Sequence, residues 1–249
     1  MERNPLLKNM RILDFTRVLS GPFATMMLGD LGAEVIKIEP PNGDESRSWP
    51  PILENGVSAY FLALNRNKRS IVLNLKEARA KEIILTLAAE TDVVVENFTP
   101  GVVAKLGIDY ETLKQANPGI IYCSISGFGQ DGPYRDKKAY DPIIQGMTGL
   151  MSITGERNGS PVKIGIPMTD LTAASHAVTA ILAAYIARLE SGQGQYIDVS
   201  LYDGVLSWMT IMSMDYFETG KSPERLWLDQ INMVPDMYIM EYDGSCFQV

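Results

Sequence analysis

Cysteine and histidine are scarce in this chain. Its 249 residues include two cysteines, Cys123 and Cys246, and one histidine, His176. This content gives no disulfide framework and no zinc-ligand spacing, and it is typical of a reducing compartment. A G-x-S-x-G motif is also missing, and Cys123 lies within an expected strand without a motif around it. We therefore expect no metal site and no serine or cysteine nucleophile.

Long runs of basic residues and long runs of apolar residues are missing as well. No block of Lys or Arg is long enough to follow a phosphate backbone, and the net charge of −8 argues against nucleic acid as a partner. The longest apolar run, residues 177–187, has about half the length of a membrane span. The N-terminus shows no apolar stretch of signal-peptide length. We expect a cytoplasmic protein that binds neither nucleic acid nor membrane.

Short β-branched runs alternate with helical patterns in the first half of the chain. The runs are residues 11–16, 34–39, 70–75, 92–98 and 119–127, and the helical patterns are 21–33, 76–90 and 109–119. Such alternation is typical of a parallel sheet with helices on both faces. RVLSGP at 17–22 replaces G-x-G-x-x-G after the first strand, which disfavours a nicotinamide or flavin dinucleotide. The predicted fold is α/β and Rossmann-like.

The second half contains helical patterns at 141–150 and 202–219 and a polar stretch at 220–230. Residues 238–242 and 245–249 flank Asp243-Gly244, which is the two-residue signal for a β-hairpin. Because the second of these strands has nothing after it to complete a layer, we expect a fold truncated before a smaller second domain. The expected division is a large domain over 1–220, followed by a linker and the start of an incomplete domain over 221–249.

Residues 162–203 carry the best candidate for a catalytic residue. A β-type run ends at 167–169, Asp170 follows it, and an alanine-rich helix is expected to begin directly after Asp170. The helix should stop at the glycines near 192–194, before a strand over 196–201. An Asp at a helix start often serves only as an N-cap, so the pattern alone leaves a purely structural role open.

This segment resembles the active-site region of the class III CoA-transferases, the family of formyl-CoA transferase and the carnitine CoA-transferases. The resemblance includes PFATMMLGDLGAEVIKIE at 22–39 and extends from about Met10 to Tyr242. It implies an enzyme that moves CoA from an acyl-CoA donor to a free carboxylic acid. Asp170 would be the nucleophile, and the reaction would pass through an aspartyl mixed anhydride and an aspartyl-CoA thioester.

The turn before the first helix is a candidate anion site. The backbone N–H groups of Val18, Leu19 and Ser20 stand at a helix N-terminus, a place suited to an anion or a developing oxyanion. By resemblance this turn lines the acyl-CoA site, and one family member carries Gln at the position of Leu19.

Further contacts with coenzyme A follow from the resemblance, with CoA as substrate and no tightly bound cofactor. The NKRSI motif at 67–71 could be a solvated basic loop, but an acidic protein needs local positive charge to hold the CoA phosphates. Lys105 stands where a relative has Arg, so its contact should be looser. The residues expected to contact CoA, beyond the turn, are Lys68, Arg69, Leu73, Lys76, Asn97, Phe98, Lys105 and Lys138.

By the same resemblance, Tyr140 and Asp141 are expected to lie beside the nucleophile. Tyr140 could donate a hydrogen bond to a substrate carboxylate, and a second acid near Asp170 would adjust its protonation. Racemases of this family typically have His-Asp here, whereas His176 lies six residues into the expected helix. A transferase is therefore favoured. A 2-methylacyl-CoA racemase and an inactive CoA-binding fragment are the alternatives.

The expected partners are an acyl-CoA and a small carboxylic acid. Donor and acceptor stay open among oxalate, succinate, malate and carnitine-type acids. The resemblance also implies a homodimer, interlocked if the chain is full length.

Overall fold

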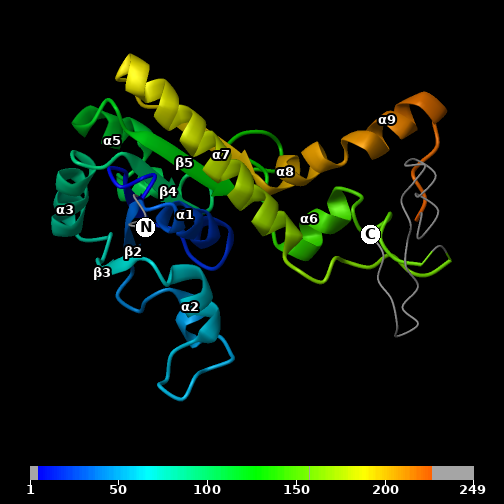
Figure 1. Cartoon of the computed structure of the whole chain (residues 1–249), viewed down its shortest axis with the longest axis horizontal. Helices are drawn as coiled ribbons and strands as arrows, with labels where there is room; N and C mark the ends of the chain where they lie inside the picture. Colours follow the sequence, from blue (N-terminus) through cyan, green and yellow to red (C-terminus); the bar gives the residue numbers. More distant parts are fainter. Residues whose placement is uncertain (1–4, 157, 226–249) are drawn as a thin grey trace.

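A parallel sheet forms the centre of the protein (Figure 1). The computed structural model describes residues 5–156 and 158–225, and within them six strands pair in the order β3-β2-β1-β4-β5-β6. All neighbours are parallel. This is the doubly wound Rossmann order, so the predicted fold class is confirmed. The strands are β1 (Arg11–Asp14), β2 (Glu34–Glu39), β3 (Arg69–Val72), β4 (Val93–Glu96), β5 (Ile121–Ser126) and β6 (Tyr196–Ser200).

Helices cover both faces of the sheet (Figure 1). One face packs against α1 (Ser20–Asp30), α6 (Asp141–Met147), α7 (Met168–Ser191) and α8 (Leu201–Trp208). The other face packs against α3 (Ala78–Ala88), α4 (Val102–Leu106) and α5 (Tyr110–Ala116). The remaining helices of the described residues are η1 (Glu45–Ser48), α2 (Ala59–Asn65) and α9 (Thr210–Thr219), and α9 extends away from the sheet in Figure 1.

Strand β4 shows why the sheet is buried on both sides. Val93 and Val95 belong to the core under α1 and α7, whereas Val94 belongs to the core under α3 and α5. Successive side chains of a strand point to opposite faces, so an unbroken valine run requires an apolar layer on each face.

Helix α7 is the central helix of its layer. It packs against α1, α8, β5 and β6, and small buried residues such as Ala173, Ala177 and Ala184 let these neighbours approach closely. Its length and mean hydropathy alone would also allow it to cross a membrane, although 39% of its most apolar window is buried in the structure. The helix ends at Gly192, which adopts the left-handed conformation with φ +70° that favours glycine.

Several boundaries differ from the expectations. Residues 161–167 form no strand, and α7 begins at Met168, two residues before Asp170. The helix expected over 202–219 is two helices that meet at Met209, and α6 is shorter than 141–150. Helices α2 and α4 were not expected. The predicted hairpin and the end of the linker, residues 226–230, lie outside the described residues, so the domain division at 220 stays a prediction.

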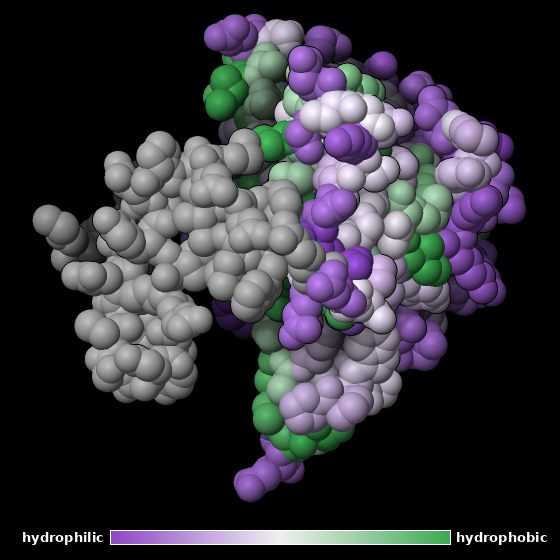
Figure 2. Space-filling view, turned by 90° about the vertical axis from the view of Figure 1, so that its right-hand side faces the viewer, coloured by the Kyte–Doolittle hydropathy of each residue, from purple (hydrophilic) through white to green (hydrophobic). Residues whose placement is uncertain are grey.

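The surface seen in Figure 2 is mixed, with hydrophilic atoms between smaller hydrophobic areas. One hydrophobic area lies at the lower end of the molecule, where the segment before α2 runs in Figure 1. In that segment Ile52 and Leu53 are 49% and 42% exposed.

Candidate active site

A cleft of about 400 Å³ lies at the carboxyl ends of the strands. Its walls come from the turn after β1, the turn after β4, the end of β5, and the first turns of α6 and α7. Strand order reverses between β1 and β4, and doubly wound sheets bind ligands at such a switch point. Of the expected site residues, the cleft brings together Val18, Ser20, Asn97, Phe98, Lys138, Tyr140, Asp141 and Asp170.

Asp170 lies in the first turn of α7 but does not cap it. The N-cap residue is Pro167, and no side chain caps this end. The structural role that the sequence left open, an N-cap through the Asp170 carboxylate, is therefore not adopted. Instead the partly buried carboxylate faces the cleft, where it accepts hydrogen bonds from the hydroxyl and the backbone N–H of Ser20.

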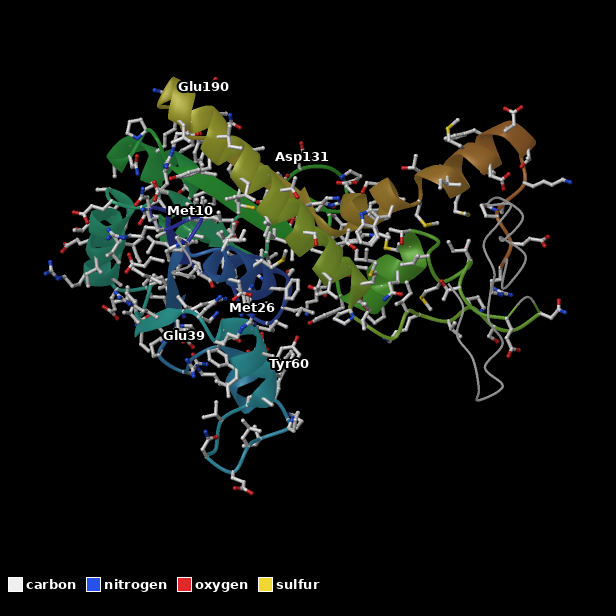
Figure 3. The ribbon with its side chains drawn as sticks, in the orientation of Figure 1. Met10, Met26, Glu39, Tyr60, Asp131 and Glu190 are labelled. Atoms are coloured by element: carbon white, nitrogen blue, oxygen red, sulfur yellow. The ribbon has the colours of Figure 1, made fainter. Side chains whose placement is uncertain are left out.

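Burial is the main influence on the protonation of Asp170. It raises the pKa of this carboxyl to about 6, the negative charge of Asp141 raises the pKa further, and the hydrogen bonds from Ser20 oppose the rise. A carboxylate of this kind is still mostly ionised at neutral pH and is more basic than an ordinary Asp. The charge of Asp170 also affects the pKa of Tyr60 in α2, which is labelled in Figure 3. Burial, then Asp170 and Asp44, raise the pKa of Tyr60 to about 12.

Asp141 connects the two helices that begin at the cleft. One of its carboxylate oxygens accepts the backbone N–H of Thr169 at 3.0 Å, and the other accepts Nε2 of Gln145 at 2.8 Å. Gln145 Oε1 in turn accepts the N–H of Ile164 at 2.8 Å. Asp141 therefore fixes the start of α7 as well as repelling the charge of Asp170.

The turn after β1 is held in a conformation that its sequence does not favour. Val18 has φ +68°, a left-handed backbone that is costly for a β-branched residue. Asn97, in the turn after β4, clasps this turn with its side chain: Oδ1 accepts the Arg17 N–H at 2.9 Å, and Nδ2 donates to the Arg17 carbonyl at 2.8 Å. The clasp keeps Ser20 opposite Asp170.

A buried polar network around Asp14, at the end of β1, supports the same turn. Asp14 accepts hydrogen bonds from the Thr16 N–H at 2.9 Å and the Thr25 hydroxyl at 2.7 Å. It also pairs with Lys68 Nζ at 2.9 Å. Burial alone would raise the pKa of Asp14, but the charges of Lys68 and Lys37 outweigh it and lower the pKa to about 2.

The expected phosphate contact of Lys68 needs correction. Its side chain is 1% exposed because the ammonium lies between Asp14 and the Pro22 carbonyl. Lys68 therefore holds the turn and the start of α1 together instead of meeting solvent. The neighbouring Arg69 side chain is 79% exposed and pairs with Glu34 at 2.9 Å.

A second cavity of about 440 Å³ lies beside the cleft. It shares Arg17, Glu45 and Phe98 with the cleft, and it includes the expected residues Leu73 and Lys76. The two cavities are therefore neighbours, with Arg17, Glu45 and Phe98 bordering both. Leu19 is buried, and Lys105 is exposed on α4; neither lines these two cavities.

Sequence reasoning missed several cleft residues. Arg17, Arg135 and Lys137 also line it and, with Lys138, bring positive charge to a cleft that Glu45 and Asp136 line as well. Arg17 lies over the Phe98 ring, 5.6 Å from its centroid. These positions fall in loops without a periodic pattern, and only the density of charge over 135–138 could have indicated them. Within the part of the chain that the structure describes, no three His, Cys, Asp or Glu side chains could together hold a metal ion.

The fold and the cleft define a doubly wound α/β protein with a carboxylate at its switch point. Comparison with known proteins defines the family. The profile of CoA-transferase family III matches residues 7–244. The chain therefore belongs to CoA-transferase family III.

Individual relatives agree with this assignment. The chain is 46% identical to "Succinyl-CoA:glutarate CoA-transferase" of Mus musculus over 96% of this chain and 55% of the relative. It is 45% identical to "Succinate--glutarate CoA-transferase" of Agrobacterium fabrum over 97% of this chain and 62% of the relative. A crystal structure of a CAIB/BAIF family protein from Brucella suis matches with TM-score 0.84 and 44% identity over 88% of this chain and 59% of that chain. The chain thus spans rather more than half the length of these relatives.

Proposed function

We propose that the protein transfers CoA from an acyl-CoA to a free carboxylic acid, with Asp170 as the nucleophile. The observation that carries this proposal is the Asp170 carboxylate itself. It opens to a cleft at the switch point of the sheet, is more basic than an ordinary Asp, and is oriented by Ser20. Partial burial suits this role, because a poorly hydrated carboxylate is a stronger nucleophile and water would otherwise intercept the activated intermediates.

The reaction takes four steps that balance. An Asp170 oxygen attacks the thioester carbonyl carbon, the C–S bond breaks, and CoA thiolate leaves a mixed anhydride on the enzyme. The thiolate then attacks the aspartyl carbonyl, which releases the donor acid and forms an aspartyl-CoA thioester. The acceptor carboxylate displaces the thiolate to form a second anhydride. The thiolate finally attacks the acyl carbonyl of this anhydride, which gives the new acyl-CoA and restores Asp170.

The two neighbouring cavities support binding of CoA along a path past Phe98, which borders both. In this proposal Leu73 and Lys76 contact the nucleotide end in the second cavity, and Asn97 and Phe98 border the pantetheine. Lys138 and Arg17 neutralise phosphate or thiolate charge near the cleft. Lys105, which is exposed on α4, remains a candidate for an outer phosphate contact. Arg69 is a weaker candidate, because it pairs with Glu34 at the amino ends of the strands, whereas the cleft lies at their carboxyl ends.

The four basic side chains that line the cleft favour an anionic acyl group. Arg135 and Lys137 line the cleft together with Tyr140, which is 66% exposed and free to donate its hydroxyl proton to a carboxylate. The two relatives named above act, by their names, on succinyl-CoA or succinate and glutarate. We therefore propose succinyl-CoA as donor and a short dicarboxylic acid such as glutarate as acceptor.

A racemase is the less favoured function. It needs a base on each face of the α-carbon. His176 packs near Gly204 between α7 and α8 and does not line the cleft. The remaining expectations, a cytoplasmic location and a homodimer that is interlocked if the chain is full length, belong to the same proposal.

Acceptor dependence tests the proposal. The full-length protein is incubated with succinyl-CoA, with and without glutarate, and the acyl-CoA products are separated by chromatography. Glutaryl-CoA formation that needs glutarate and disappears in Asp170→Asn is expected. Loss of the α-proton from a 2-methylacyl-CoA without any acceptor would instead establish the racemase, and CoA binding without either reaction would leave a binding protein.

A further inference from the structure

Glu96 is a buried carboxyl group that the proposed reaction does not use. It is the last residue of β4, and it is 1% exposed. Its Oε2 accepts the backbone N–H of Phe98 at 2.7 Å, and it also accepts a hydrogen bond from the Ser124 side chain. By accepting the N–H two residues further along the chain, the Glu96 carboxylate fixes a tight turn whose residues Asn97 and Phe98 line the cleft.

The turn that Glu96 holds is part of both cavities. Phe98 lines the cleft and the second cavity, and Arg17 lies over its ring. Asn97, between Glu96 and Phe98, makes the two hydrogen bonds that clasp the backbone of Arg17. A change at Glu96 therefore affects the proposed CoA path through Phe98. It also affects the turn that carries Ser20, because Asn97 holds the backbone of Arg17 in that turn.

The titratable groups near Glu96 come from β5 and β6. Tyr122 of β5 and Tyr196 and Asp198 of β6 lie on the same face of the sheet as Glu96, whereas Cys123 of β5 points to the opposite face. The Tyr196 hydroxyl lies 3.1 Å from Ser124 Oγ and donates to it, so a chain of hydrogen bonds leads from the partly exposed Tyr196 to Glu96. Burial, together with the charge of Asp198, raises the pKa of Glu96 to about 7 against the hydrogen bonds from Ser124 and Phe98.

We propose that Glu96 is a positioning residue whose ionised carboxylate holds the Asn97-Phe98 turn in the form that binds CoA, so that proton uptake by Glu96 weakens CoA binding. The inference rests on the proposed function, since it assumes that the path past Phe98 binds CoA. A hydrogen bond to a carboxylate is roughly twice as strong as one to a neutral acceptor. The difference in free energy between a charged and a neutral hydrogen bond corresponds to about a fivefold change in affinity, so protonation of Glu96 should weaken CoA binding by about this factor.

The test measures CoA binding by calorimetry between pH 6 and pH 8.5, in the full-length protein. All variants carry Asp170→Asn as well, so that neither turnover nor the titration of Asp170 contributes. The parent should bind CoA about fivefold more weakly at the acid end than at the basic end. Glu96→Gln should bind weakly at every pH. Glu90→Gln, which removes an exposed carboxylate with a 79% exposed side chain, should match the parent.

A second variant separates positioning from a merely structural role. Asp198→Asn removes the negative charge that faces Glu96, so the midpoint of the pH dependence should move to lower pH. The phosphates of CoA titrate identically with every variant and cancel in the comparison. If Glu96→Gln keeps the parent's pH dependence, or if Asp198→Asn leaves its midpoint unchanged, the inference is overturned. Turnover is not measured here, so failure of this inference is distinguishable from failure of the proposed function.

Discussion

Replacing Asp170 by Asn should make the protein more stable while it abolishes turnover. The folded protein raises the pKa of this carboxyl from its usual 3.8 to about 6. Between these two values the folded state binds more protons than the unfolded state, so the stability contributed by this group falls as the pH rises. Above pH 6 the ionised carboxylate is a net cost to folding. Asn has nearly the same shape, is neutral at every pH, and can still accept a hydrogen bond from Ser20.

The size of this effect follows from the shift. A difference of roughly two pKa units corresponds to about 3 kcal/mol at pH 8, and to about half of that at pH 5, where the unfolded group alone is ionised. Burial of Asp170 is incomplete, so about 1–3 kcal/mol is expected at pH 8. The assay is urea unfolding of both proteins at pH 5 and pH 8, with Glu90→Gln as a control for removal of an exposed carboxylate. An Asp170→Asn protein that is no more stable than its parent at pH 8 would refute the reasoning.

Three further predictions concern the site and its support. The rate constant kcat should fall about tenfold per pH unit below pH 6, as Asp170 takes up its proton; an acid limb that stays flat to pH 5 would contradict this assignment. Lys68→Met should leave a buried carboxylate unpaired and cost about 3–5 kcal/mol in urea unfolding, whereas the exposed Arg69→Met should cost less than about 1 kcal/mol. Gly127→Ala should place its new methyl group against the loop that carries Lys138, raising the KM for acyl-CoA and lowering stability by about 1–3 kcal/mol; Gly165→Ala, which meets open space, is the matched control and should change neither.

Periodicity predicted the sheet well because each buried strand carries its own signal. The run over 34–39 is β2 without change, and the valine-rich run over 92–98 contains β4. Helix α2 was not predicted because it has only seven residues and its start depends on a single capping side chain, that of Ser58. The start of α7 was misplaced because Pro167 precedes the helix and Asp170 lies inside its first turn, where Asp is also an acceptable residue.

The site was predictable only where residues are close in sequence or belong to a familiar motif. Asp170, Asp141 and the turn before α1 meet in one cleft, as the resemblance implied. The burial of Lys68 was not predictable, because the sequence of a basic cluster does not show whether its lysine faces solvent or pairs with a carboxylate 54 positions away. The clasp between Asn97 and Arg17, and the contact of Gln145 with Asp141 and Ile164, also depend on tertiary packing.

Covalent trapping tests the central claim most directly. The full-length protein is mixed with succinyl-CoA and hydroxylamine, and the peptide that contains Asp170 is examined by mass spectrometry. A hydroxamate on Asp170, absent without acyl-CoA, is the predicted result, because both the anhydride and the aspartyl-CoA thioester react with this nucleophile. An unmodified Asp170 under conditions in which CoA transfer proceeds would contradict the account.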